Sequence, residues 1–240
     1  VYIKDSGTAT NNGAIEFSGE KAVGLYGENG GHVVNNNTIK IEGADSVAVY
    51  AKGNVSTATN TANGTITLDG DNLIGMRYEI GTGTSSGKLL NEGNITSTGI
   101  RAIGMSNDGG TRETRNDGII TFTGDRSIGI HSSRLGPGHA IINTGVISVG
   151  DSADATNPSV GIYTDNVNDT VSNYGEVKAG NQSIGIYGTN VWLGAASKTI
   201  VGDNAVGVYS SGGNVNIDNG AELKVGNGES VGVYYSGSNG

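Results

Sequence analysis

The sequence predicts an all-β fold, a single-stranded parallel β-helix of about nine coils with three short strands per coil. Three observations predict it: a motif that recurs about every 26 residues, a composition rich in Gly and poor in Pro, and hydrophobic residues in short runs of period two. Self-similarity at 20 to 50 residues is typical of solenoids, propellers and arrays.

The repeated motif is Gly, two polar residues, a small residue, an aliphatic residue, Gly or Ala, a second aliphatic residue and most often Tyr. Residues 202–209 (GDNAVGVY), 180–187 (GNQSIGIY) and 43–50 (GADSVAVY) are three copies. The central Gly or Ala falls at Gly24, Ala48, Gly75, Gly104, Gly129, Gly161, Gly185, Gly207 and Gly232.

Composition and periodicity favour strands over helices. The 240 residues include 43 Gly and only 2 Pro, and charged residues make up 15%, below the roughly 25% of ordinary globular domains. No long window keeps helical spacing, whereas runs such as 15–17 and 39–41 alternate with period two. One coil would then use the runs 140–142, 147–149 and 160–162. Because one coil buries too little apolar surface to fold alone, each coil needs its neighbours.

Strand alternation predicts which side chains enter the core. In the copy at 202–209, Val206 and Val208 are expected to point inward, and Gly207 and Tyr209 outward. The Tyr position would form an outer column, which can be read either as a stabilising ladder or as a contact strip for a sugar or a protein.

A second motif, Asn, any residue, Gly, any residue, Ile or Val, precedes the first. Its Gly is expected to take a positive φ at a corner, and Asn37 would replace it there because Asn tolerates that conformation next best. The first Asn is expected to stack from coil to coil as an amide ladder. The members of this ladder are Asn11, Asn35, Asn91, Asn116, Asn143 and Asn173.

We expect one domain over residues 1–240, because the period continues without a linker. Both ends fall inside repeat motifs and lack the atypical sequence of a capping coil, so a segment of a longer repetitive protein is expected. The absence of Cys excludes a disulfide scaffold.

Insertions and charge single out the middle of the chain. The spacing from Gly150 to Gly161 is enlarged, and the corners at 79–88 and 132–139 are long, as binding loops on a solenoid can be. All six Arg lie within 77–134. In this interval Arg77, Ser106 and His131 replace Tyr in the column.

The candidate ligand-binding residues come from this interval. Two interpretations stay open: the arginines form ion pairs with nearby carboxylates, or they recognise an anionic ligand, since guanidinium groups match carboxylates. The candidates are Arg77, Tyr78, Arg101, Arg112, Arg115, Arg126, His131 and Arg134.

No catalytic, metal or cofactor motif is complete. With three His in the chain, a Ser, His, Asp triad would be accidental, and His131 and His139 are expected to be exposed loop residues. No cofactor is expected. A net charge of −9 argues against nucleic acid or an anionic membrane as the main partner.

The alternation of the two motifs, as in 173–177 followed by 183–187, resembles the passenger repeats of large type V autotransporter adhesins, particularly those of the fusobacterial kind. The resemblance covers the whole chain and implies a long right-handed β-helix on the outer membrane, exposed to the extracellular space. It also implies export through the protein's own C-terminal outer-membrane barrel, which lies outside this sequence. Its partners would be receptors, protein or glycan, on host cells or other bacteria, and it would not be an enzyme.

Two alternatives remain. A β-helical polysaccharide lyase or glycoside hydrolase would need carboxylates and basic residues on one face, and Glu79, Asp108 and Asp125 with Arg101 or Arg126 are the available set. An ice-binding β-helix would need a regular Thr column. Thr pairs such as Thr65 and Thr67 occur without an evident one.

Overall fold

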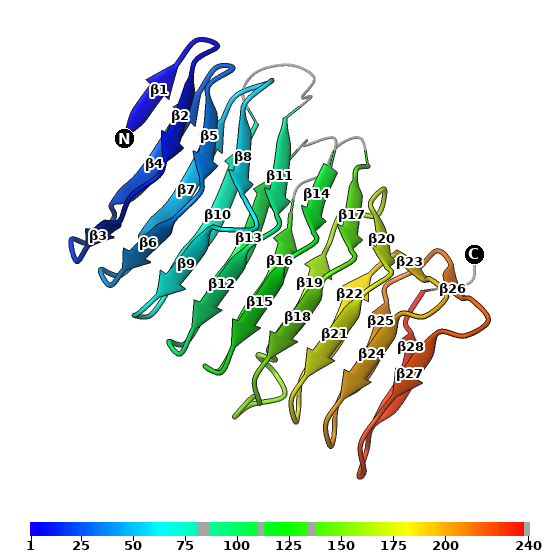
Figure 1. The fold of residues 1–240 in the computed structure, drawn as a ribbon. Helices are drawn as coiled ribbons and strands as arrows, with labels where there is room; N and C mark the ends of the chain where they lie inside the picture. Colours follow the sequence, from blue (N-terminus) through cyan, green and yellow to red (C-terminus); the bar gives the residue numbers. More distant parts are fainter. Residues whose placement is uncertain (81–86, 110–112, 134–137, 238–240) are drawn as a thin grey trace.

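The computed structural model describes residues 1–80, 87–109, 113–133 and 138–237. Every regular element in these ranges is a β-strand, and the strands form three parallel sheets that wind into a solenoid of about nine coils (Figure 1). This confirms the predicted fold class. No helix that could cross a membrane occurs in the described ranges.

The first sheet contains the repeated Gly–Tyr motif, one strand per coil. Its strands are β1 (Tyr2–Lys4), β4 (Val23–Glu28), β7 (Val47–Lys52), β10 (Ile74–Glu79), β13 (Ile103–Asp108), β16 (Ile128–Ser132), β19 (Val160–Thr164), β22 (Ile184–Gly188), β25 (Val206–Ser210) and β28 (Val231–Tyr235).

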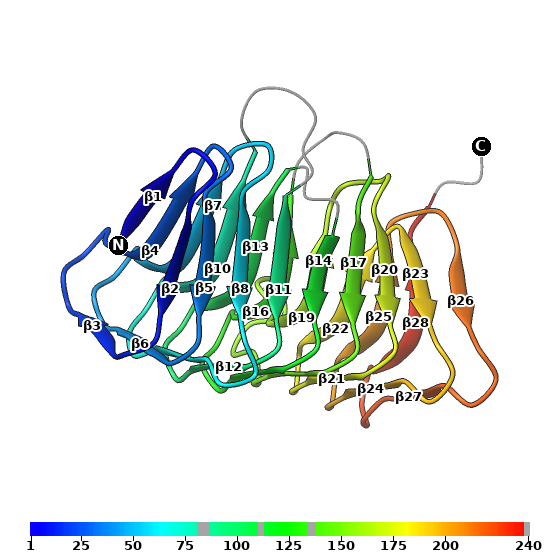
Figure 2. The ribbon, with the colours of Figure 1, turned by 45° about the horizontal axis from the view of Figure 1, so that its top comes forward.

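The second and third sheets complete each coil. Figure 2 shows the strands of the second sheet side by side in a row along the solenoid. The second contains β2 (Thr8–Asn11), β5 (His32–Asn35), β8 (Thr57–Asn60), β11 (Lys88–Asn91), β14 (Glu113–Asn116), β17 (Ala140–Asn143), β20 (Thr170–Asn173), β23 (Asn190–Leu193) and β26 (Val215–Ile217). The third contains β3 (Ile15–Phe17), β6 (Thr38–Ile41), β9 (Thr65–Leu68), β12 (Asn94–Ser97), β15 (Ile119–Phe122), β18 (Val146–Val149), β21 (Glu176–Ala179), β24 (Lys198–Val201) and β27 (Glu222–Lys224).

The inward-facing residues of the first sheet differ from the prediction. Val208 is buried as expected, but Gly207 also faces the core and Val206 lies half-exposed on the outer face. The physical reason is a break in the alternation at the Gly. Val206 pairs with Val231 and Val208 with Val233, while the Gly between them has no register partner. Two consecutive residues therefore point inward, and the aliphatic residue before the Gly points outward.

The inward Gly makes room for the third sheet across the core. A Cβ on Gly185 would lie 2.6 Å from the carbonyl oxygen of Gly207 and 3.0 Å from Cγ2 of Thr199. A Cβ on Gly129 would lie 2.4 Å from Cγ2 of Ile147. Close packing, and not an open outer strip, therefore restricts this column to the smallest residues, Gly in most coils and the buried Ala48 in one.

The predicted Asn ladder is confirmed at the end of the second sheet. Each side-chain Nδ2 donates to Oδ1 of the next coil, at 2.8 Å from Asn11 to Asn35 and 2.7 Å from Asn91 to Asn116. Asn60 belongs to it as well, donating to Asn91 at 2.8 Å. Asn60 was not predicted as a member because two extra residues separate it from the Gly that follows. The ladder stops at Leu193, which occupies the next position after Asn173.

The corner Gly residues do not have positive φ, so that prediction was wrong. Gly118 and Gly145 are confined by the coil below: a Cβ would lie 2.2 Å from the carbonyl oxygen of Gly93 and 2.0 Å from that of Gly118, respectively. Asn37 is not in the left-handed region either. That conformation occurs at the corner before the first sheet, once in most coils. It is adopted by Lys21, Asp45, Asn72, Arg101, Arg126, Gln182, Asn204 and Gly228.

Candidate functional site

The outer face of the first sheet carries a column of stacked aromatic rings. Tyr163 and Tyr187 stack with ring centroids 4.9 Å apart, and Tyr187 and Tyr209 at 4.8 Å. His131 continues the column at 5.4 Å from Tyr163. Burial raises the pKa of Tyr163 and of Tyr187, so both phenols stay protonated at neutral pH and can donate hydrogen bonds.

A second column of aliphatic side chains runs beside the rings. It consists of the residues that precede the inward Gly, and Ile128, Val160 and Ile184 are its members next to the stacked tyrosines. Ile128 and Ile184 are half-exposed on the outer face, whereas Val160 is only 4% exposed. Together they form an apolar strip between the corner and the tyrosines. This column was predicted to lie inside the core, so the strip was not expected from the sequence.

The enlarged corner at 151–158 rises beside this strip. Its fold is held by hydrogen bonds at both ends: Ala153 N donates to Asp125 Oδ1 at 3.1 Å, and Ser159 N donates to Ser152 Oγ at 2.5 Å. At its tip, Thr156 donates through N and Oγ1 to Asp154 Oδ1, both at 2.8 Å. The corner is therefore an ordered wall.

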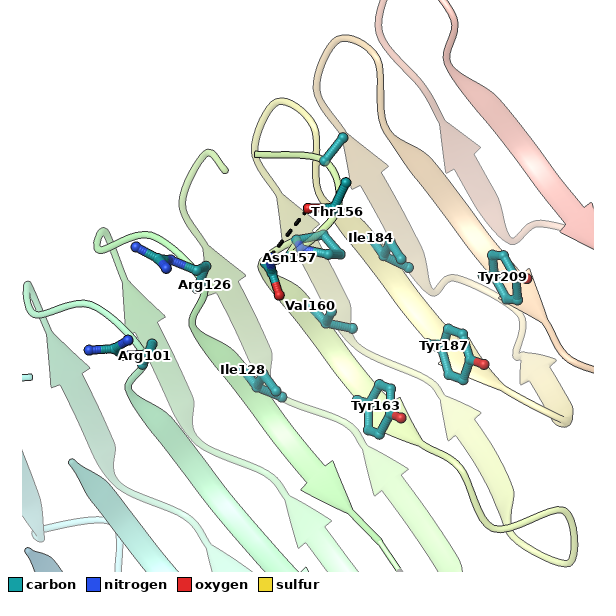
Figure 3. A pocket seen from close by; sticks show the side chains of 12 residues that line it. Arg101, Arg126, Ile128, Thr156, Asn157, Val160, Tyr163, Ile184, Tyr187 and Tyr209 are labelled. Carbon is teal, nitrogen blue, oxygen red and sulfur yellow. Dashed lines mark hydrogen bonds between the residues drawn. The ribbon is translucent and has the colours of Figure 1, made fainter. Parts of the chain in front are cut away.

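The wall, the strip and the rings enclose a groove of about 770 Å³. Figure 3 shows its parts as three rows along the solenoid: the corner residues, the aliphatic residues and the tyrosines. Its lining residues are Arg101, Arg126, Ile128, Ala155, Thr156, Asn157, Pro158, Val160, Tyr163, Ile184, Tyr187 and Tyr209.

Two of the sequence-predicted residues, Arg101 and Arg126, belong to this groove. They occupy the same left-handed corner position in adjacent coils, with φ of 57° and 56°. Arg126 Nε lies 3.2 Å from Asp125 Oδ2. Arg101 makes no ion pair within the described residues. Figure 3 shows both side chains extending from the corner on the side away from the tyrosines.

The other described candidates lie elsewhere. Arg77 is on the first sheet, 2.5 Å from Asp108 and with its guanidinium carbon 5.6 Å from the ring centroid of Tyr50. Arg115 is on the second sheet, 2.7 Å from Asp117. Tyr78 has no exposed surface and donates to the carbonyl of Gly53 at 2.8 Å, so it contributes nothing to the outer face.

His131 lies on β16 in the tyrosine column and is half-buried, so the expectation that it is an exposed loop residue was wrong. Burial lowers its pKa. Arg112 and Arg134 lie outside the described residues, as do residues 81–86 of the long corner at 79–88 and residues 134–137 of the corner at 132–139.

The carboxylates that the enzyme alternative requires do not all lie close together. Glu79 and Asp108 are register partners at the ends of β10 and β13, and both lie within 4 Å of Arg77. Asp125 precedes β16 and therefore lies at the opposite end of the sheet, next to Arg126. Among the described residues no cluster of three or more His, Cys, Asp or Glu has the arrangement of a metal site.

A buried polar cluster closes the corner between the first and second sheets, and it contradicts the expectation that His139 is an exposed loop residue. His139 Nδ1 lies 2.9 Å from Asp169 Oδ1, and its Nε2 lies 3.0 Å from Ser132 Oγ. These distances are similar to those in a nucleophilic triad, but Nδ1 makes no well-aligned hydrogen bond, and Nε2 also lies 2.8 Å from Asn107 Nδ2. However, Ser132 is only 1% exposed and also donates to Asp169 Oδ2 at 3.1 Å, so a substrate cannot reach its hydroxyl here.

A short Thr column lies on the outer face of the third sheet. Thr67, Thr96 and Thr121 are register partners in three consecutive coils. Lys40 occupies the position before them and Ser148 the position after. The coils thus align threonines that the sequence analysis saw only as local pairs, over three coils rather than the whole face.

Comparison with known protein families gave one match that covers most of the chain. A family model described as BigA third pectate lyase-like domain matches residues 1–193, which is most of the chain. Searches of curated proteins and of solved structures gave no match. The family match indicates a β-helix domain of a bacterial surface protein.

Proposed function

On the premise that the chain belongs to the family of BigA third pectate lyase-like domains, we propose that it is an adhesive segment of a bacterial surface protein. In this proposal the β-helix is a rigid support that presents its outer groove to receptors on host cells or other bacteria, and it performs no catalysis. The observation that carries the proposal is the preformed groove on the first sheet, built from parts of several consecutive coils.

The rigidity of the support favours this role. The Asn ladder runs without interruption from Asn11 to Asn173, and parallel pairing continues through all three sheets. A binding surface whose walls are already ordered avoids the entropic cost of ordering them when a partner binds. The corner at 151–158 meets this condition through its internal hydrogen bonds.

The resemblance to type V autotransporter passengers gives the finer part of the proposal. It would place the segment outside the outer membrane, exported through a C-terminal barrel of the same protein.

The test is attachment of the purified segment to host cells and to partner bacteria. A fluorescently labelled segment should bind in a saturable manner and be displaced by unlabelled segment. A variant that fills the groove, Ile184→Trp, should attach more weakly, and circular dichroism checks that its fold survives. Wild-type protein that does not attach to any cell surface would contradict the proposal and assign the segment the role of a spacer.

The enzyme alternative has one favourable observation, the pair Glu79 and Asp108 beside Arg77. A β-helical lyase or hydrolase would release new chain ends from a polysaccharide. An assay for reducing ends on acidic and neutral polysaccharides, with Glu79→Gln and Asp108→Asn as controls, would detect such activity. Activity abolished by these substitutions would overturn the non-enzymatic assignment.

A further inference from the structure

We propose that Tyr50, on the outer face of the first sheet, is a site of one-electron oxidation at which Glu79 accepts the phenolic proton. The co-reactant is a one-electron oxidant in solution, either a free radical or an oxidised metal complex. This inference goes beyond the proposed function and does not depend on it, because it concerns the chemistry of the tyrosine column and not attachment. Its support comes from the contacts of one phenol, the charges around it and a second tyrosine stack in the same sheet.

The phenol of Tyr50 has a proton acceptor in contact with it. Tyr50 lies on β7 and Glu79 at the end of the adjacent strand β10. The Tyr50 hydroxyl group donates to Glu79 Oε2 at 2.5 Å. Loss of an electron makes a phenol a much stronger acid, so oxidation is favoured where a base is already within hydrogen-bond reach of the proton. Glu79 is such a base.

The step balances in electrons and protons. The oxidant takes one electron from Tyr50 and is itself reduced by one electron. The O–H bond of Tyr50 breaks, and an O–H bond forms on Oε2 of Glu79. The products are a neutral tyrosyl radical and a carboxylic acid, which remain joined by a hydrogen bond that Glu79 now donates.

Both groups are in the required protonation state at neutral pH. Burial raises the pKa of Tyr50, and the hydrogen bond to Glu79 raises it further, so the phenol holds its proton. Burial would also raise the pKa of Glu79, but hydrogen bonds from Tyr50 and Lys52 hold it below its usual value, so the carboxylate is ionised. The pair therefore starts with the proton on the phenol and an acceptor beside it.

The charge of Arg77 couples the proton to the electron. The guanidinium carbon of Arg77 lies 5.6 Å from the ring centroid of Tyr50. A ring that lost an electron and kept its proton would carry a positive charge next to this cation, and like charges at that distance repel. A ring that passes its proton to Glu79 in the same step stays neutral. Removing the acceptor should therefore slow the oxidation of Tyr50 itself.

Tyr50 belongs to a stack of three rings that has carboxylates at both ends. The ring centroids of Tyr26 and Tyr50 lie 5.0 Å apart, and those of Tyr2 and Tyr26 lie 5.3 Å apart. The hydroxyl group of Tyr2 donates to Glu28 Oε2 at 2.7 Å. Tyr2 is 56% exposed, so water competes for its hydrogen bond. Tyr50 is half-buried, and this is why we assign the reaction to it.

The second tyrosine stack of the same sheet supplies a comparison. Tyr163, Tyr187 and Tyr209 have centroid spacings of 4.9 and 4.8 Å. Within the described part of the chain, none of their hydroxyl groups donates to a carboxylate. Both stacks share the ring contacts, whereas the carboxylate acceptor is found in the first. Preferential oxidation of Tyr50 over Tyr187 would therefore report the effect of the acceptor and not of stacking.

The test is laser flash photolysis of the whole 240-residue chain at neutral pH, with ruthenium tris-bipyridyl as photosensitiser and persulfate as electron acceptor. Transient absorption of the tyrosyl radical gives its rate of formation and its yield. The reference protein carries Trp192→Phe and Tyr2→Phe, which remove an exposed indole and the other phenol bonded to a carboxylate. Tyr50→Phe and Glu79→Gln are made in this reference, and Tyr187→Phe is the matched control. Circular dichroism checks that each variant is folded.

With oxidant limiting, we expect Tyr50→Phe to lose most of the radical yield and Tyr187→Phe to keep it. Glu79→Gln should slow radical formation by about tenfold or more, because a hydrogen bond to a charged acceptor is lost. Deuterated water should slow formation in the reference protein, since the proton moves with the electron. Equal yields in Tyr50→Phe and Tyr187→Phe, or equal rates in Glu79→Gln and the reference, would overturn the inference. Attachment to cells is a separate measurement and decides only the proposed function.

Discussion

Replacing Asn116 by Ala removes one interior member of the buried amide ladder. Asn116 Nδ2 donates to Asn143 Oδ1 at 2.9 Å, and Asn116 Oδ1 accepts from Asn91 Nδ2 at 2.7 Å. The substitution leaves an acceptor on Asn143 and a donor hydrogen on Asn91 without their ladder partners, in a site with no exposed surface. Each unsatisfied buried group costs about 1–3 kcal/mol, so the free energy of unfolding should fall by about 2–6 kcal/mol.

Two controls make this prediction specific to the ladder. Asn11 is the first described member of the ladder and has a ladder partner on one side only, Asn35, so Asn11→Ala should cost about half as much. Asn36 Nδ2 donates to Asn12 Oδ1 at 3.0 Å at an exposed position, and Asn36→Ala should change stability by at most about 0.5 kcal/mol.

The assay is urea denaturation followed by far-ultraviolet circular dichroism and by the fluorescence of Trp192. Coincidence of the two transitions tests whether unfolding is cooperative, because repeat proteins can unfold in parts. If Asn116→Ala loses no more stability than Asn36→Ala, the amide ladder merely follows the backbone geometry and does not stabilise the coils.

Three further predictions follow from the columns and the buried cluster. Gly185→Val should lower the free energy of unfolding by at least about 2 kcal/mol through overpacking against the Gly207 carbonyl. The control is Gly19→Ala, where a Cβ meets nothing within 4 Å. An equal urea midpoint for the two variants would contradict the prediction. Tyr187→Ala breaks two ring contacts and should cost at least about 1 kcal/mol, with Tyr187→Phe much milder in the same titration. Burial would raise the pKa of Asp169, but hydrogen bonds led by that from His139 hold it below its usual value. The ionised carboxylate of Asp169 therefore stabilises the fold fully above about pH 4, and this stabilisation is lost as pH falls through the lowered pKa. The difference in free energy of unfolding between wild type and Asp169→Asn should shrink on acidification. A difference that stays constant with pH would refute this.

The fold was predictable because the same two motifs recur in nearly every coil. The spacing of the motif gave the coil length, and the Asn and Tyr positions formed the expected columns. The facing of Val206 and Gly207 was not predictable from period two, because the alternation breaks at a Gly that has no register partner. The role of Gly118 was also missed, since its constraint is a carbonyl of the coil below and not its own φ.

The groove was only partly predictable. The enlarged corner at 151–158, the tyrosine column and the arginines were each visible in the sequence, but as separate features. Stacking of parallel coils brings residues about one repeat apart in sequence next to each other, as Arg101 N and the carbonyl of Asp125 show at 2.9 Å. Which columns share a face depends on the side-chain direction at the inward Gly. Strict alternation predicts the opposite direction there, so the aliphatic strip was not expected.

The parallel pairing of the three sheets has a mechanical consequence. The hydrogen bonds between coils run along the solenoid axis, so a pulling force along that axis loads them one coil after another rather than all at once. A coil that detaches gives up about 4.8 Å of rod and releases about 25 residues, or about 85 Å of extended chain. Under tension the domain would therefore lengthen in steps of about 80 Å, each dissipating the energy of one coil's contacts. If the segment tethers a cell, as proposed, a steady pull would extend it through successive coil detachments and not through a single rupture.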